Sequence, residues 1–159
     1  MTRDEVLGLF PGAKDDPAVQ ASVSRPPSSL GVSSFTLMPP KHTTAEQFEG
    51  ISHIAFNFLD GRVSNFQIGY NGPAYSHVDK FVEKFASEST LPSVDQWEPY
   101  VGLDNMKLLK CAEFEVRVFA GGEGGNLNYV LLQDLEADKT LKERRKKARE
   151  QASPTPGNQ

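Results

Sequence analysis

Three histidines, His42, His53 and His77, are the side chains of this sequence best suited to transfer protons near neutral pH or to hold a metal ion. None follows another by three to five positions, the spacing that lets two ligands on one helix meet a single zinc ion. The single cysteine, Cys111, excludes an internal disulfide and a zinc site made of several cysteines. The sequence therefore predicts no metal site and no cofactor, and it leaves open a metal site assembled from distant segments.

Other patterns that could support catalysis have simpler structural interpretations. Cys111 falls inside a predicted strand, where a lone cysteine is usually a small buried hydrophobe. The glycine-rich run at residues 121–125 lacks a following Lys-Ser or Lys-Thr pair, so it indicates a hairpin turn and not a phosphate-binding loop. The remaining acid–base candidates are Asp15 with Asp16 and Glu113 with Glu115, pairs typical of a solvated surface. We therefore expect no catalytic residue and no enzyme; a small enzyme with its site between sheet and helices is the least favoured alternative.

Four aromatic residues are the better candidates for a function. Tyr70, Tyr75, Trp97 and Tyr100 fall at two predicted junctions between strands and helices. Trp and Tyr often anchor protein interfaces, and they also close the edges of hydrophobic cores, so both interpretations stay open. If a partner-binding surface exists, we expect it to use these residues together with the long loop at residues 13–31.

Charge is unevenly distributed along the chain. The formal net charge is -4. Residues 138–150 hold seven basic and three acidic side chains, a balance of +4, which leaves -8 for the remainder. Such an acidic body predicts no binding to nucleic acid, whose phosphates require clustered Lys and Arg. The residues that could contact an anionic surface are Arg144, Arg145, Lys146 and Lys147, and the alternative is a solvated terminal helix.

The length of 159 residues suits one domain, and the sequence contains no apolar run long enough to cross a membrane. In the first half, a capping box at Thr2 and Glu5 starts a short helix that Pro11 ends. The sequence then predicts the loop at 13–31, a strand over 32–38 and a connection over 41–50 with one helical turn. Residues 51–70 alternate around Asp60-Gly61 and predict a hairpin with an inward aromatic face.

In the second half, Ser76 is expected to cap a helix that runs to about Glu88, with a loop over residues 91–102. Leu108–Phe119 alternates as one strand. On the return strand, Leu127, Tyr129 and Leu131 are expected to face inward, with Val130 and Leu132 on the other face. A polar helix over residues 139–150 and a disordered tail over 151–159 complete the chain.

These elements predict an α+β fold in a single domain over residues 1–150. Its antiparallel sheet has about five strands, contributed mainly by two hairpins, with helices packed on one face in the order α-β-ββ-α-ββ-α. A short capped helix followed by strands occurs twice, which suggests a pseudo-repeat of residues 1–72 and 76–134.

The segments 1–12 and 56–63 carry a family resemblance. The first segment is Met1-Thr2-Arg3-Asp4-Glu5-Val6-Leu7-Gly8-Leu9-Phe10-Pro11-Gly12, and the second is Phe56-Asn57-Phe58-Leu59-Asp60-Gly61-Arg62-Val63. They resemble the opening helix and the hairpin of the small outer-membrane lipoprotein family SmpA/OmlA, also called BamE-like. The match covers less than half of the chain. A tandem version of this layout would resemble the β-lactamase-inhibitor-protein-like arrangement.

This resemblance implies a protein-binding or scaffolding role in the bacterial cell envelope, with another protein as partner. The family carries a signal sequence and a lipid-accepting cysteine before this point, and Cys111 does not take that place. Location in the envelope or periplasm, and any membrane association, therefore depend on an upstream lipidated segment. The alternative is a cytoplasmic accessory or regulatory protein that uses its basic C-terminal helix.

Overall fold

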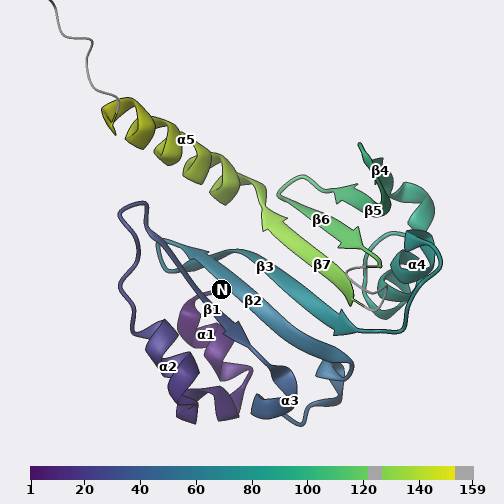
Figure 1. Ribbon diagram of the computed structural model, residues 1–159, viewed down its shortest axis with the longest axis horizontal. Coiled ribbons are helices and arrows are strands. Elements are labelled where there is room, and N and C mark those ends of the chain that lie inside the picture. Colours follow the sequence, from purple (N-terminus) through teal and green to yellow (C-terminus); the bar gives the residue numbers. More distant parts are fainter. Residues whose placement is uncertain (122–126, 153–159) are drawn as a thin grey trace, which may run out of the picture.

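The computed structural model describes residues 1–121 and 127–152. Figure 1 shows one twisted sheet in the strand order β1-β2-β3-β7-β6-β5-β4, with every neighbouring pair antiparallel. The α+β class is confirmed, but the described residues form seven strands where about five were expected. The strands are β1 (Val32–Leu37), β2 (Ile51–Leu59), β3 (Arg62–Asn71), β4 (Glu98–Tyr100), β5 (Leu103–Lys110), β6 (Phe114–Phe119) and β7 (Leu127–Asp134).

Five α-helices and three short 3-10 helices are present in the described residues. The helices are α1 (Arg3–Gly8), α2 (Pro17–Val23), α3 (Pro39–His42), α4 (Val78–Glu88) and α5 (Leu135–Ala152); the 3-10 turns are η1 (Pro11–Asp15), η2 (Glu46–Phe48) and η3 (Val94–Gln96). No helix among these residues is long and apolar enough to cross a membrane. Figure 1 shows that α5 extends away from the end of β7.

The hairpin of β2 and β3 forms as the sequence predicts. Asp60 and Gly61 have φ angles of 51° and 79°, the left-handed values that a two-residue turn of this kind requires. Ile54 and Phe56 pair with Ile68 and Phe66 on one face. The capping box of α1 is also confirmed, since the Thr2 side chain accepts from the Glu5 amide and the Glu5 carboxylate accepts from the Thr2 amide.

The N-terminal loop and the helix boundaries differ from the prediction. Residues 13–31 contain α2, because Asp16 accepts hydrogen bonds from the amides of Ala18 and Val19 and so caps a helix that begins at Pro17. His77, and not Ser76, caps α4. The terminal helix starts at Leu135 because the Asp134 carboxylate accepts from the Ala137 amide. It extends through Ala152, so residues 151 and 152 are helical where a disordered tail was expected, and the rest of that predicted tail, residues 153–159, lies outside the described part of the chain.

The segment 108–119 is two strands and not one. Cys111 donates its amide to the Phe114 carbonyl at 2.9 Å, which closes a tight turn between β5 and β6. No glycine or proline marks this turn, so the alternation of apolar residues runs through it unbroken. The loop at 91–102 also contains the short strand β4. Of the glycine run at 121–125, only Gly121 lies within the described residues.

The prediction for the faces of β7 was also wrong. Val130, 1% exposed, lies in the core between Ile68 of β3 and Val118 of β6, while Tyr129 and Leu131 alternate onto the opposite face. The reason is that β7 pairs on both sides, so its register to β3 and β6 fixes which residues face the helices.

Helices α1, α2 and α4 pack on the same face of the sheet. One core cluster joins α1 and α2 to β1 and β2, and a second joins α4 to β5, β6 and β7. Ile68 and Tyr70 of β3 contact both clusters, so the two halves share one continuous sheet. The central strands β3 and β7 therefore lie between two separate helical layers.

Candidate functional site

Between these two helical layers, the apolar face of the central strands forms a groove. Its first hollow has a volume of about 560 Å³. The floor is formed by Phe66 and Ile68 of β3 and Leu132 of β7, and the walls include Leu9 at the end of α1 and Phe114 of β6. Because α1 and α4 cover only the flanks, these floor side chains are partly and not fully buried.

A second hollow of about 590 Å³ lies against α4. Its aromatic lining consists of Tyr70, Tyr75, Phe81 and Phe85. Both hollows include Tyr70 and Gln47, so we treat them as one feature, the central groove. It crosses the helical face of the sheet from the end of α1 to α4.

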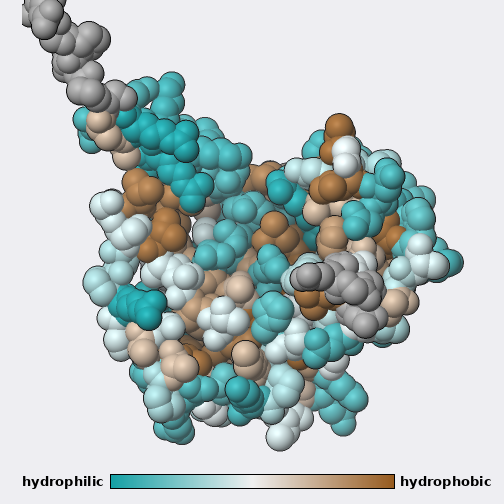
Figure 2. Space-filling model, in the orientation of Figure 1, coloured by the Kyte–Doolittle hydropathy of each residue, from teal (hydrophilic) through white to brown (hydrophobic). Residues whose placement is uncertain are grey.

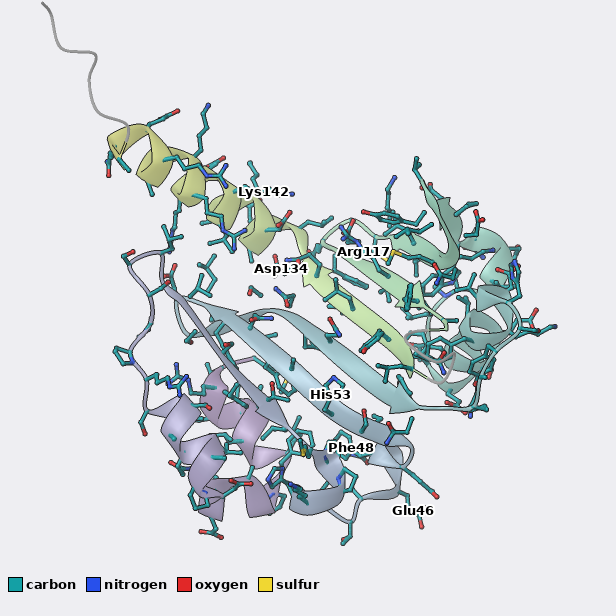
Figure 3. All side chains as sticks on the ribbon, in the orientation of Figure 1. Glu46, Phe48, His53, Arg117, Asp134 and Lys142 are labelled. Carbon is teal, nitrogen blue, oxygen red and sulfur yellow. The ribbon has the colours of Figure 1, made fainter. Side chains whose placement is uncertain are left out.

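Two exposed apolar side chains line the first hollow. Leu9 is 48% exposed and Met1 is 50% exposed. Leu9 is the C-cap residue of α1, where the chain turns toward Pro11, and it therefore projects from the helical layer instead of packing beneath it. Phe48 of η2 forms another part of the wall, and its ring centroid lies 4.7 Å from that of the buried Phe10. Figure 3 shows Phe48 and Glu46 on the short segment that leads into β2.

Tyr70 and Tyr75, two of the predicted partner-binding residues, both lie in the central groove. Tyr75 stacks on Phe81 with ring centroids 5.2 Å apart, and Tyr70 meets Phe81 edge-on at 5.5 Å. Burial raises the pKa of the Tyr70 phenol to about 12, with a smaller contribution from the charge of Glu88. The Tyr70 hydroxyl is therefore neutral over the physiological range and can donate a hydrogen bond to a bound segment.

The other two predicted aromatic residues lie elsewhere. Trp97 is only 3% exposed, belongs to the core beneath α4 and donates its indole N–H to the Pro92 carbonyl at 2.9 Å. It is thus a core residue, one of the two interpretations the sequence left open. Tyr100 packs against the Arg117 guanidinium, 5.4 Å from the ring centroid, on the sheet face away from the helices. None of residues 13–31 lines either hollow, so a contribution of that segment to partner binding stays a prediction.

The charged side chains around the groove are mostly acidic. Glu46, Glu49 and Glu88 line the hollow beside α4, and Glu113 and Asp134 line the other. Among the residues that the structure describes, Lys84 is the one basic side chain that lines either hollow, and its Nζ lies 3.9 Å from the Glu88 carboxylate. Sequence reasoning missed this rim, because its members come from η2, α4, β7 and the turn before β6.

Each of the three histidines has a local structural role. His42 is buried and its Nε2 lies 2.9 Å from the Asp16 carboxylate, a hydrogen bond that lowers the pKa of Asp16 below its ordinary value. His53 approaches Tyr129 edge-on over the open sheet face, with ring centroids 6.3 Å apart. His77 caps α4. Within residues 1–121 and 127–152, no three His, Cys, Asp or Glu side chains converge in a way that could hold a metal ion.

Arg144, one of the predicted contacts to an anionic surface, is engaged inside the molecule. Its guanidinium donates to both carboxylate oxygens of Asp60, at 2.9 and 2.6 Å, and to the Leu30 carbonyl at 2.9 Å. This contact ties α5 to the tip of the β2–β3 hairpin, and the hydrogen bond lowers the pKa of Asp60. Arg145, Lys146 and Lys147 are exposed, and Figure 2 shows a hydrophilic surface over most of α5.

We expect the Arg144→Ala variant to detach α5 from the hairpin while the sheet stays folded, because no residue of α5 is fully buried. Amide hydrogen exchange along α5 should become several-fold faster, and Arg145→Ala should leave it unchanged. Since the pKa of Asp60 is lowered in the folded state, the contact is at full strength above the ordinary carboxyl pKa and weakens as pH falls through the lowered value. Equal exchange rates in both variants would show that the contact does not hold α5.

Comparison of the chain with protein-family models, curated proteins and solved structures finds no match. The groove, its aromatic lining and its acidic rim are therefore the features from which a function must be argued.

Proposed function

We propose that this protein is a non-enzymatic interaction domain that binds an apolar segment of another protein in the central groove. One observation carries the proposal: the apolar face of β3 and β7 is left uncovered at the centre of the sheet, with Leu9 exposed beside it. A monomer usually covers such a face with its own helices, so an uncovered patch between two helical layers is typical of an interaction site.

The aromatic lining supports the same conclusion. Tyr70 and Tyr75 combine apolar rings with hydroxyl groups, a combination that is common where protein interfaces bind most tightly. The rings of both residues pack on Phe81, so little side-chain freedom remains to be lost when a partner binds.

We further propose the bacterial cell envelope as the place of this interaction. The support is the resemblance of residues 1–12 and 56–63 to the SmpA/OmlA, or BamE-like, family. In the structure the first segment contributes Met1, Leu9 and Phe10 to the lining of the groove, and the second contributes Phe56 and Val63. The segments that carry the resemblance are thus also segments that build the proposed site.

A second candidate function uses α5. Lys142, Arg145, Lys146 and Arg149 recur at the spacing of one helix face and line a shallow hollow with Glu150. Arg144 contacts Asp60 from a different side of the helix, so the basic stripe faces away from the sheet. A cytoplasmic accessory protein that contacts an acidic partner through α5 would use this stripe and not the groove.

The exposed leucines Leu9 and Leu103 provide a matched test, since they are 48% and 43% exposed and only Leu9 lines the groove. The probe is an uncharged amphipathic helical peptide with a leucine face and glutamine elsewhere. We expect Leu9→Asn to weaken its binding about tenfold, because the buried leucine contact is lost, and Leu103→Asn to leave it unchanged. Binding of the peptide is measured by fluorescence anisotropy. Equal weakening by the two variants, or no binding to the unchanged protein, would contradict the proposal.

A further inference from the structure

We infer that the segment bound in the central groove is an α-helix whose apolar face is flanked by basic side chains. This inference rests on the proposed function and specifies the chemistry of the partner. Its two components, the basic flanks and the helical conformation, follow from different observations.

The basic flanks follow from the charges around the groove. In the described part of the chain, a single lysine, Lys84, lines the two hollows together with five carboxylates: Glu46, Glu49, Glu88, Glu113 and Asp134. Glu46, Glu49, Glu88 and Glu113 are exposed, so a partner can approach them without first burying them. Lys84 is already near Glu88, at 3.9 Å, and offsets only part of this negative charge.

Each of the two hollows has acidic side chains in its lining. Glu113 and Asp134 lie in the hollow beside α1, and Glu46, Glu49 and Glu88 lie in the hollow beside α4. A segment that follows the groove would meet carboxylates along its whole length. Complementary charge of this kind selects the partner and speeds its approach, more than it adds to the final affinity.

The helical conformation follows from the sheet topology. The floor strands β3 and β7 are hydrogen-bonded on both sides, β3 to β2 and β7, and β7 to β3 and β6. They offer no free backbone edge, so a partner cannot bind here by adding a strand to the sheet. It must bind through side chains, and a helix does so by inserting apolar residues at positions i, i+3 or i+4, and i+7 into a groove between helices.

The exposed helix of a second copy does not fit this description well. Helix α5 has a basic stripe, but its 18 residues include only Leu135 and Leu141 as large apolar side chains. A groove floored by Phe66, Ile68 and Leu132 needs a more apolar partner face than α5 provides. We therefore assign the groove to a different protein, and self-association is one outcome of the test.

The test uses the full chain and three helical peptides of about 18 residues, a length that spans roughly 27 Å. The peptides have the same leucine face and carry lysine, glutamine or glutamate at the remaining positions. We expect the lysine peptide to bind about tenfold more tightly than the glutamate peptide at low ionic strength. We expect this difference to shrink at about 0.5 M salt, where charges are screened over a few ångströms.

Two charge-neutralised variants locate the effect. Glu46→Gln with Glu49→Gln removes two carboxylates from the rim, and Glu136→Gln with Glu143→Gln removes two exposed carboxylates from α5. Only the first pair should weaken binding of the lysine peptide, and it should leave the glutamine peptide unchanged.

The outcomes separate this inference from the proposed function. If all three peptides bind equally, the basic partner is wrong and the apolar groove stands as a binding site. If none binds, both are wrong. A dimer in analytical ultracentrifugation that Leu9→Asn converts to monomer would assign the groove to a second copy and overturn the inference.

Discussion

Replacing Phe58 by alanine is expected to lower the free energy of unfolding by about 3–5 kcal/mol, one of the two largest effects we predict. Phe58 is fully buried, its ring stacks on Phe35 with centroids 5.2 Å apart, and the Arg3 guanidinium lies 5.9 Å above it. It joins β1, β2 and α1 in the first core cluster. Truncation would leave a cavity that the neighbouring elements cannot fill. Strands β1 and β2 are fixed by their backbone pairing, and α1 is fixed by its capping box.

Phe119→Ala is the matched control for this experiment. Phe119 is partly exposed on the open face of the sheet, where its ring centroid lies 6.2 Å from that of Tyr129. We expect its truncation to cost clearly less than that of Phe58, as measured by urea denaturation at neutral pH. Similar losses for the two variants would mean that the core beneath α1 is not packed as described.

Replacing Asn128 by alanine is the second of these predictions, with an expected loss in the free energy of unfolding of about 1–3 kcal/mol, because two part-buried hydrogen bonds are lost together. Asn128 of β7 has no exposed surface. Its side-chain amide donates to the Pro73 carbonyl at 3.0 Å, and its carbonyl accepts from the Gly121 amide at 3.3 Å. Alanine would leave the Pro73 carbonyl and the Gly121 amide without this hydrogen-bond partner, and it would leave a small cavity at a fully buried position.

The same change should also affect the central groove. Asn128 holds the segment after β3 beside β7, and that segment carries Tyr75 into the groove. We therefore expect Asn128→Ala to weaken peptide binding as well as stability. Asn65→Ala is the control for stability alone, since Asn65 is only partly buried and accepts from Asn57 at 2.8 Å. Urea denaturation that ranks Asn65→Ala as the more destabilising change would refute this account of Asn128.

Local patterns predicted those elements of the fold whose signals lie within a few residues. The Asp60-Gly61 turn requires two left-handed residues, and the sequence supplies the pair best suited to it. The capping box at Thr2 is equally local. The turn between β5 and β6 escaped prediction because Ala112 and Glu113 carry no turn signal, and alternation alone cannot show where a strand reverses.

The groove could be predicted only in part, because it is assembled from distant segments. The aromatic pattern singled out Tyr70 and Tyr75, which line the groove, and the same reasoning selected Trp97, whose indole is buried. Sequence position cannot separate an interface aromatic from a core aromatic, since both occur at the ends of strands and helices. The role of Leu132 depends on the register of β7 between β3 and β6, and without that register the alternation of β7 led to the two faces being assigned the wrong way round.

The most direct test of the central claim is a methyl NMR titration of the full chain with the lysine-flanked leucine peptide. We expect the methyl resonances of Leu9, Ile68 and Leu132, which line the central groove, to shift with a common saturation curve. Leu103 and Val101, which are exposed outside the groove, should not move. Shifts confined to the open face, or to Leu141 on α5, would contradict the claim that this protein binds its partner in the groove.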